Sequence, residues 1–369
     1  MSSPAQCHVA IACGGTGGHY FPGVAVAHEL VERGARVTLF ISEKEIDRRA
    51  AASLPELSHI EIPAVAFSFW HSLRFLNGLK KATRQVRVQF KDDPPQAVLA
   101  MGGFTAAAPI RVGRQIGAAT FLHESNAIPG RANRFLARWA DEIFIGFEAA
   151  RHRFKHKIIS ASGTPVRPEF RNQNRAESRR RLGFDAARPL ILVTGGSQGA
   201  RAINQLVTAA LPKLPEAQWV HLCGTHDFVE VKAAHEKTGA RSTVHEFFDD
   251  MPSALAAADL VVSRAGASSL AELAAAQAPA ILVPLPGAAD DHQRANARAA
   301  VDCGAAVMLE QAETTPAAFS ETVNALISNS SRLEKMGASM KLLDRPDAGQ
   351  TIAGRIINAC EESEVDCGR

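Results

Sequence analysis

The chain has 369 residues, which suggests two domains at roughly 100–200 residues each. Apolar residues make up 46% of the chain and charged residues 21%, an ordinary globular balance with ample material for two cores. The 41 Lys and Arg residues nearly cancel the 38 Asp and Glu residues, so the net charge of +3 gives no reason to expect a nucleic-acid partner.

The cysteines and the N-terminus indicate the compartment. None of the cysteines forms a Cys-x-x-Cys pair, so we expect neither a metal site nor a disulfide framework. The scattered cysteines are Cys7, Cys13, Cys223, Cys303, Cys360 and Cys367. The N-terminus lacks the basic-then-apolar order of a signal peptide, and no uninterrupted apolar run is long enough to span a bilayer. Reduced thiols without an export signal point to the cytoplasm.

The N-terminal half opens with a strand, a glycine loop and a helix. The apolar run 8–13 predicts a strand that ends in the glycine loop 14–18, and the amphipathic stretch 24–33 predicts the helix that follows. Four more strands are predicted at Val37–Ile41, Ala97–Met101, Thr120–His123 and Glu142–Ile145. This order is typical of the opening of a Rossmann-like unit.

The C-terminal half repeats the opening. A strand at 190–194 leads into the glycine loop 195–199 and a helix at 200–210. Further strands are predicted at Gln218–Cys223, Thr243–Phe247, Leu260–Ser263 and Ala280–Pro284, and helices at Ser269–Ala276 and Asp291–Cys303. The alternation predicts an α/β fold with two Rossmann-like domains, whose parallel sheets face each other across a cleft.

Turn-forming residues mark the boundary between the halves. The segment 163–168 (Gly-Thr-Pro-Val-Arg-Pro) is a natural hinge, so we expect an N-terminal domain over 1–165 and a C-terminal domain over 166–345. After the break at Arg345-Pro346, a helical pattern resumes at 350–360. The segment from about 346 to 369 is therefore expected to return to the first domain.

Four glycine turns follow predicted strands, and we expect them along one cleft. The loop 14–19 brings backbone N–H groups close together before a helix, which suits a phosphate, although a tight turn without ligand is the alternative. Tyr20 stands where a dinucleotide fingerprint needs its third glycine, so NAD binding is disfavoured. The other turns are Gly102-Gly103, Gly195–Gly199 and Arg264–Ser268.

His19 lies where the first loop becomes a helix. Its imidazole is a candidate general base near neutral pH, or else a histidine that only hydrogen-bonds to the loop. Ser197 and Gln198 of the second loop offer a hydroxyl and an amide to diphosphate oxygens.

Further polar residues follow predicted strands. Glu272 completes a capping box with Ser269, or else binds a ribose diol beside the glycine turn. The run 123–126 (His-Glu-Ser-Asn) suits a sugar or phosphate site, or forms a solvated turn. The run 290–293 (Asp-Asp-His-Gln) offers donors and acceptors to sugar hydroxyls, or is an ordinary charged helix start. No Asp-x-Asp motif is present, so we hypothesise that no metal is needed.

The stretch from Phe67 to Phe90 is basic and aromatic, and its first acidic residue follows only at Asp92. Such an amphipathic stretch fits attachment to an anionic membrane surface. The alternative is a core-packed helix with a solvated basic face.

Together these motifs resemble the MurG family of peptidoglycan N-acetylglucosaminyltransferases, which convert lipid I to lipid II. The matching segments appear in the family's order and cover nearly the whole chain; they are 14–19, 122–126, 163–167, 195–201, and 264–266 with Glu272. The resemblance implies a GT-B fold, an inverting mechanism and no cofactor. It implies UDP-N-acetylglucosamine as donor and undecaprenyl-pyrophosphoryl-muramyl-pentapeptide as acceptor, at the cytoplasmic face of the membrane.

The resemblance also implies site residues. His19 would take the proton of the muramyl 4-hydroxyl. The donor side would be formed by Thr16, Gly17, Gly18, Asn126, Arg167, Ser197, Phe248, Ala267, Ser268, Glu272 and Gln293, and the acceptor side by Gly15, Gly103, Phe104, His123 and Glu124. Among these, Ser197 would touch the diphosphate and Glu272 the ribose.

The chain departs from the family pattern at four positions. His292 precedes Gln293 where paired glutamines are usual, and Phe104 replaces a frequent Tyr. Ala265 stands where Ser is common, and Gln277 stands where a helix-ending Gly is common. None of these removes a whole binding element.

Two other functions compete with transfer to a lipid acceptor. A UDP-N-acetylglucosamine 2-epimerase shares the fold but would need a carboxylate-rich acid/base set, and the basic aromatic stretch favours a lipid acceptor instead. A catalytically silent sugar-nucleotide sensor or scaffold is the alternative from another class, and the presence of His19, Asn126 and Glu272 weighs against it.

Overall fold

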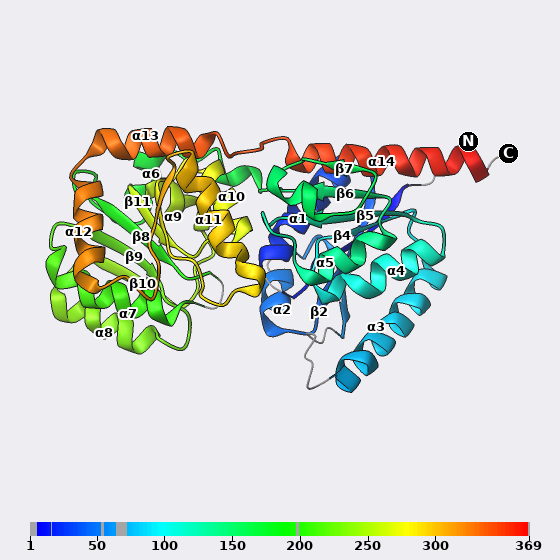
Figure 1. The fold of residues 1–369 in the computed structure, drawn as a ribbon, viewed down its shortest axis with the longest axis horizontal. Coiled ribbons are helices and arrows are strands. Elements are labelled where there is room, and N and C mark those ends of the chain that lie inside the picture. The colour runs from blue at the N-terminus through cyan, green and yellow to red at the C-terminus, as the bar shows by residue number, and fades with distance from the viewer. Residues whose placement is uncertain (1–5, 16, 53–54, 64–71, 197–198, 368–369) are drawn as a thin grey trace. The chain divides into compact units, whose positions relative to one another are not determined.

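The computed structural model describes residues 6–15, 17–52, 55–63, 72–196 and 199–367. The chain divides into two compact units (Figure 1). Unit 1 comprises residues 1–167 and 345–369, and unit 2 comprises residues 168–344. Helices alternate with parallel strands in both units, which confirms the predicted α/β class.

Unit 1 is built on sheet A, whose described strands run in the order β3-β2-β1-β4-β5-β6-β7, and every pairing in it is parallel. The strands are β1 (His8–Ala12), β2 (Arg36–Ser42), β3 (Ser58–Ile62), β4 (Ala97–Ala100), β5 (Ala119–Glu124), β6 (Glu142–Ile145) and β7 (Ile159–Ser160). The helices are α1 (Gly17–Glu32), α2 (Glu45–Ala52), α3 (Ser72–Asp92), α4 (Ala107–Gln115), α5 (Arg131–Leu136) and α14 (Ala348–Cys367).

Alternation along the strands of sheet A builds a core on each face. Val9 and Ile11 of β1 point into a core shared with α1 and α14. Ala10 and Ala12 of the same strand point into the opposite core, against α3 and α4. Because successive side chains of a strand face opposite sides, a strand covered on both faces must be apolar throughout, as all of β1 except His8 is.

Unit 2 repeats this plan on sheet B, whose described strands run in the order β10-β9-β8-β11-β12-β13. The strands are β8 (Leu190–Thr194), β9 (Gln218–Leu222), β10 (Ser242–His245), β11 (Leu260–Ser263), β12 (Ala280–Leu282) and β13 (Ala306–Met308). The helices are α6 (Arg175–Arg181), α7 (Arg201–Ala210), α8 (Phe228–Thr238), α9 (Met251–Ala257), α10 (Ala267–Ala275), α11 (His292–Asp302), α12 (Pro316–Ile327) and α13 (Ser330–Lys341).

The C-terminal helix α14 packs on unit 1, as predicted. It runs alongside α1 (Figure 1). Its residues Ile352, Ala353 and Ile356 are fully buried in the core that it shares with α1. Burial of each isoleucine contributes about 1.5–3 kcal/mol, so this helix adds substantially to the core of unit 1.

A disulfide joins Cys7, just before β1, to Cys360 of α14. The expectation that the cysteines remain unpaired is therefore wrong for these two residues. They lie 353 positions apart in sequence, and only the return of α14 to unit 1 brings them together. Spacing rules read short intervals between cysteines, so they could not reveal this pair.

The basic stretch proposed for membrane contact falls mostly on α3, while Phe67 lies outside the described residues. Val86 and Phe90 are buried in the core, and the ring of Phe90 lies 5.5 Å from that of Phe40. These two residues are therefore core residues, as the alternative interpretation expected. Leu76 and Val88 remain about half exposed (49% and 57%) beside exposed Lys and Arg side chains.

No helix within the described ranges is long and apolar enough to cross a membrane.

Candidate functional site

The glycine turns lie in two pairs, one at the carboxyl edge of each sheet. In sheet A, β1 pairs with β2 on one side and β4 on the other, so the strand order reverses between β1 and β4. In sheet B, β8 has β9 and β11 as its neighbours. Open parallel sheets bind ligands outside such switch points. The loops after β1 and β4 form one pair, and those after β8 and β11 form the other.

The first glycine loop passes close to the end of β2. A Cβ on Gly14 would lie 2.3 Å from the backbone nitrogen of Ser42, so a larger residue could not fit there. Gly15 adopts a φ of 112°, which is open to glycine but rarely to other residues. Gly17 and Gly18 form the first positions of α1, where the helix dipole favours an anion. Thr16 lies outside the described residues.

His19 packs against the second glycine turn. A Cβ on Gly102 would lie 3.1 Å from His19 Nε2, and a Cβ on Gly103 would lie 3.3 Å from His19 Cε1. The loss of hydration in this packing lowers the pKa of His19 to about 4. Lys44 also lowers the pKa, whereas Asp47 raises it. The imidazole is therefore neutral at pH 7, the form in which it can accept a proton.

Gly103, which has a φ of 73°, precedes a short 3-10 helix that begins at Phe104. Gly103 and Phe104, both predicted on the acceptor side, thus lie on the turn against which His19 packs.

His123, at the end of β5, is fully buried, and protein groups engage both of its ring nitrogens. Nε2 lies 3.0 Å from the carbonyl oxygen of Gly163, which can only accept, so this nitrogen carries the proton. Nδ1 then accepts from Ser125 Oγ at 3.3 Å. Burial lowers the pKa of His123 to about 4, and the nearby His19 adds to this effect. His123 therefore ties β5 to the turn at Gly163.

Glu124 is also buried, and both carboxylate oxygens accept two hydrogen bonds. Oε1 accepts from the backbone nitrogen and from Nδ2 of Asn126, each at 2.9 Å. Oε2 accepts from Gly130 N at 3.0 Å and from Asn133 Nδ2 at 2.9 Å. Burial nevertheless raises the pKa of Glu124, because desolvation outweighs these four donors. The carboxylate holds the loop that presents Asn126.

Sequence reasoning missed two polar residues around His19. Asn133 on α5 is buried, and its amide group would lie within 2.9–3.1 Å of a Cβ on Gly102. Asp47 on α2 is also buried and accepts a hydrogen bond from Gly15 N at 2.6 Å. Both lie on short helices without a recognisable motif, so only the tertiary fold reveals their proximity to His19.

The glycine loop of unit 2 is equally tight. A Cβ on Gly195 would lie 2.3 Å from Ala200 N, and one on Gly199 would lie 2.2 Å from Cys223 O. Glycine is thus required at both ends of the loop. The predicted diphosphate contact Ser197, with its neighbour Gln198, lies outside the described residues.

The turn after β11 opens α10, with Ala267 and Ser268 as its first two residues and Gly266 as N-cap. Backbone N–H groups of a first helical turn are suited to bind an anion. The capping-box interpretation of Glu272 is wrong, because Ser269 is already the third residue of the helix and the N-cap has no side chain to bond. The ribose contact remains a prediction for Glu272.

Strained backbone precedes α11. Asp290 and Asp291 both adopt left-handed conformations, with φ of 53° and 57°, which are costly for residues other than glycine. His292 is the first residue of α11, and Gln293 Oε1 accepts from Leu285 N at 2.9 Å. The side chain of Gln293 thus closes the loop between β12 and α11.

Two further predicted donor residues lie in different units. The ring of Phe248, after β10, lies 4.8 Å from the ring of His245 in unit 2. Arg167 belongs to unit 1, where its guanidinium lies 5.3 Å from the ring centre of Phe21 on α1.

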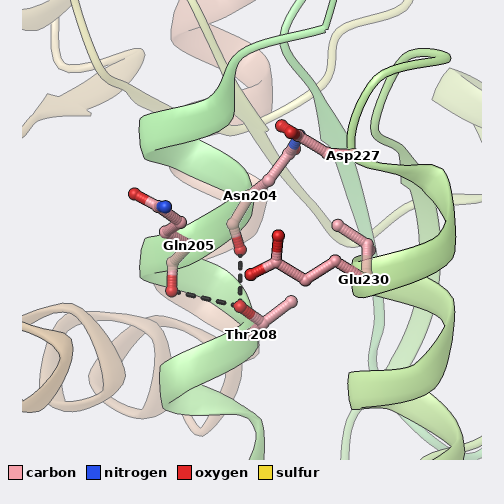
Figure 2. A pocket seen from close by; sticks show the side chains of 6 residues that line it. Asn204, Gln205, Thr208, Asp227 and Glu230 are labelled. Atoms are coloured by element: carbon pink, nitrogen blue, oxygen red, sulfur yellow. Dashed lines mark hydrogen bonds between the residues drawn. The ribbon is translucent and has the colours of Figure 1, made fainter.

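One cavity of unit 2 lies between α7 and α8 and is lined by Asn204, Thr208 and Asp227, among others (Figure 2). Thr208 Oγ1 donates to Asn204 O at 2.9 Å and Asn204 Nδ2 donates to Asp227 at 2.7 Å, so its walls are already hydrogen-bonded. Its volume of about 10 Å³ admits a single water at most. It is therefore no site for a sugar nucleotide.

A second cavity of unit 2, of about 200 Å³, is lined in part by Gln277 and Pro279, which precede β12. It therefore lies at the edge of sheet B opposite to the glycine turns.

Within the described parts of the chain, no group of three or more His, Cys, Asp or Glu residues is arranged to hold a metal ion.

Both halves of the chain match known families. Residues 9–145 match the glycosyltransferase family 28 N-terminal domain, and residues 190–352 match the C-terminal domain of the same family. The chain is 38% identical, over 98% of its length and 95% of the relative, to a protein of Myxococcus xanthus named UDP-N-acetylglucosamine–N-acetylmuramyl-(pentapeptide) pyrophosphoryl-undecaprenol N-acetylglucosamine transferase. A protein of the same name from Geobacter sulfurreducens is 37% identical over 96% of this chain and 99% of the relative.

Solved structures agree with these matches. The crystal structure of Acinetobacter baumannii MurG covers 96% of this chain and 99% of its own, with a TM-score of 0.74 and 28% identity. A UDP-N-acetylglucosamine 2-epimerase structure from Listeria monocytogenes, described as putative in its title, has a TM-score of 0.69 at 14% identity over 99% of this chain and 98% of its own, so it shares the fold alone. The chain therefore belongs to the MurG family of N-acetylglucosamine transferases, within glycosyltransferase family 28.

Proposed function

We propose that this protein transfers N-acetylglucosamine from UDP-N-acetylglucosamine to the 4-hydroxyl of the muramyl sugar of undecaprenyl-pyrophosphoryl-muramyl-pentapeptide. The observation that carries the proposal is identity of 38% over 98% of the chain with a relative named for this transfer. The epimerase structure is only 14% identical to this chain and shares the fold alone, so it supports no competing activity.

The proposed reaction is a direct displacement. The acceptor oxygen forms a bond to the anomeric carbon as the bond from that carbon to the diphosphate oxygen breaks, so the configuration inverts and UDP leaves. His19 takes the proton of the attacking hydroxyl. Its neutral imidazole, packed on the Gly102-Gly103 turn at the switch point of sheet A, supports this role.

We propose that unit 2 binds the donor. The first-turn N–H groups of Ala267 and Ser268 would stabilise the leaving diphosphate, together with Ser197. Glu272, one turn further along α10, would accept hydrogen bonds from the ribose. Phe248 would lie beside the uridine, and Gln293 would lie beside the sugar. Because helix dipoles and N–H groups meet the leaving charge, the reaction needs no metal.

We propose that unit 1 binds the acceptor. Gly103 and Phe104 lie on the turn beside His19. Asn126 would reach the transferred sugar, held in place by Glu124. The buried bonds of Glu124 and His123 support a role in positioning the loop rather than in direct contact with the acceptor.

We also propose attachment to the cytoplasmic face of the membrane through the exposed face of α3. Lys80, Lys81, Arg84 and Arg87 are exposed there beside Leu76 and Val88. Cationic side chains around exposed apolar ones suit an anionic lipid surface. Such a surface would also bring the protein to its lipid acceptor.

The experiment that tests the function is transfer of labelled N-acetylglucosamine from UDP to a lipid I analogue, with and without a chelator. We expect lipid-linked product at the same rate in both conditions. A strict requirement for Mg²⁺ would contradict the metal-free mechanism, and UDP release without lipid-linked product would contradict the proposed transfer. Replacement His19→Ala should reduce turnover by roughly 10²-fold to 10⁴-fold and leave the affinity for the donor unchanged.

A further inference from the structure

The carboxylate of Asp47 is buried behind the first glycine loop. The residue is 1% exposed, and its Oδ2 accepts from Gly15 N at 2.6 Å, from Ser42 N at 3.1 Å and from Ser42 Oγ. Its Oδ1 makes no hydrogen bond with any described residue. Burying a carboxylate is costly unless donors compensate it, so these three charge-assisted bonds are what hold Asp47 in place.

These contacts fix the loop from one side. Asp47 holds the N–H of Gly15, while Lys44 Nζ donates to the carbonyl oxygen of the same glycine at 3.1 Å. The two side chains thus bond to both backbone polar groups of Gly15. This glycine has a φ of 112° and lies two positions before α1 begins. Because Asp47 occupies the N–H of Gly15, this group does not serve as a donor to an acceptor diphosphate.

The charges of the same two side chains act on His19, whose pKa Asp47 raises and Lys44 lowers. Among the described residues, the titratable groups whose charges act on its imidazole are Lys44 just before α2, Asp47 on α2 and His123 of β5. The neighbours from the other elements, Gly102-Gly103 and Asn133, carry no charge. A carboxylate beside an imidazole stabilises the imidazolium that forms when the ring takes a proton.

We propose that Asp47 is a positioning residue for the transfer: it fixes Gly15 at the entrance of α1 and holds a negative charge beside the imidazole of His19. This inference rests on the proposed function, in which His19 is the base. Asp47 acts through the loop and through His19, and it touches neither substrate.

Replacement Asp47→Asn tests the inference. The amide keeps one acceptor oxygen but loses the charge, so kcat should fall by roughly 10-fold to 100-fold, less than for loss of the base itself. The KM for the donor should remain unchanged. The acid limb of kcat against pH should move to lower pH, because Asp47 raises the pKa of His19. Replacement Asp47→Glu keeps the charge and should restore the position of the limb.

The matched control is Asp141→Asn. Asp141 Oδ2 accepts from Thr120 N at 2.9 Å and from Thr120 Oγ1 at 2.8 Å, the same kinds of donor that Ser42 offers to Asp47. It lies at the amino edge of sheet A, beside the start of β5, far from the glycine turns in the same sheet. This variant should lose stability but keep the wild-type kcat and pH profile.

A second variant covers the outcome in which Asp47→Asn does not fold. Lys44 is exposed and lowers the pKa of His19, so Lys44→Gln should move the acid limb to higher pH, opposite to Asp47→Asn. If wild-type protein transfers the sugar but neither variant moves the limb, the inference is overturned. If wild-type protein does not transfer the sugar at all, the proposed function fails instead.

Discussion

Glu124 and Asn126 are joined by two hydrogen bonds that end on the same carboxylate oxygen. Both the backbone nitrogen and Nδ2 of Asn126 lie 2.9 Å from Glu124 Oε1. The second oxygen, Oε2, anchors Gly130 and Asn133. One buried side chain thus fixes both ends of the loop between β5 and α5.

Replacement Glu124→Gln should disrupt this loop. The amide turns one acceptor oxygen into an NH₂ group that faces N–H donors, so the free energy of unfolding should fall by about 1.5–3 kcal/mol. Because Asn126 loses its orientation, kcat should fall as well. Urea unfolding and the transfer assay measure the two effects. The control Glu142→Gln, a buried glutamate that accepts from Ser160 at 2.6 Å, should lose stability only. Equal kcat in the two variants would contradict the positioning role.

Buried histidines should make unit 2 sensitive to acid. His221 Nε2 donates to Asn204 Oδ1 at 3.0 Å, and its Nδ1 accepts from His235 Nε2 at 3.1 Å. Burial lowers the pKa of His221 to about 3 and that of His235 to about 4, below the value of 6.5 in the unfolded chain. The unfolded chain therefore binds more protons below pH 6.5, and the free energy of unfolding falls as the pH drops.

The expected loss is about 1–2 kcal/mol per histidine between pH 6.5 and 5. Urea unfolding at several pH values measures it, and His19 and His123 of unit 1 add to the same trend. Replacement His235→Gln should flatten the dependence, whereas replacement of the exposed His226 by Gln should not. An unchanged slope in His235→Gln would refute this explanation.

Gln277 ends α10 in a conformation that suits glycine. Its φ is 54°, and the bonds Ala278 N to Leu273 O and Gln277 N to Ala274 O form a Schellman motif. Replacement Gln277→Gly should raise the free energy of unfolding by about 1 kcal/mol, because the left-handed conformation costs a non-glycine residue about that much. The control Ala276→Gly, at a right-handed position, should lower it by about 0.5–1 kcal/mol. Equal effects of both variants would disprove the strain.

The disulfide between Cys7 and Cys360 should stabilise unit 1. Replacement Cys360→Ser should lower the free energy of unfolding by about 2–5 kcal/mol under oxidising conditions, because the bond restricts the unfolded chain. Reductant should have the same effect on the wild-type protein and none on the variant. Cys303→Ser, at an unbridged cysteine, is the control. Non-reducing peptide mapping without a Cys7–Cys360 peptide would contradict the pairing.

Binding to membranes should depend on the basic face of α3. Sedimentation with vesicles that contain anionic lipid should remove the protein from solution, and the double replacement Lys80→Glu and Lys81→Glu should weaken this binding several-fold. Binding should weaken as salt is raised. The double replacement Lys335→Glu and Lys341→Glu, at exposed positions of α13 in unit 2, changes the net charge by the same amount and is the control. Equal binding of wild-type protein and the α3 variant would exclude this surface.

The glycine turns were predicted correctly, because a glycine marks a position where the backbone leaves no room for a Cβ. Gly14 and Gly195 fit only because a Cβ would collide with backbone atoms, and this requirement is visible in the residue type. The long apolar strands were also predicted correctly, since burial on both faces leaves an unbroken apolar run. The edge strands β3, β7 and β13 were missed because they are short and partly exposed.

Contacts between distant segments could not be predicted. Asp47 and Gly15 are 32 positions apart, and nothing in the sequence around Asp47 marks it as a partner of a glycine loop. The start of α1 was also missed by seven residues, because Gly17, Gly18 and Pro22 are poor helix formers that the fold overrides. For Glu272, a local motif suggested a cap that the actual helix start at Ala267 excludes.

The central claim is tested most directly by the fate of a ¹³C-labelled donor. UDP-N-acetylglucosamine labelled at the anomeric carbon is incubated with the protein and a lipid I analogue, and carbon NMR follows the label. The proposed function predicts one new signal, from a β-linked sugar on the lipid, with one UDP released per sugar transferred. Label that stays on the nucleotide as the 2-epimer, or that joins the lipid with retained configuration, would contradict it.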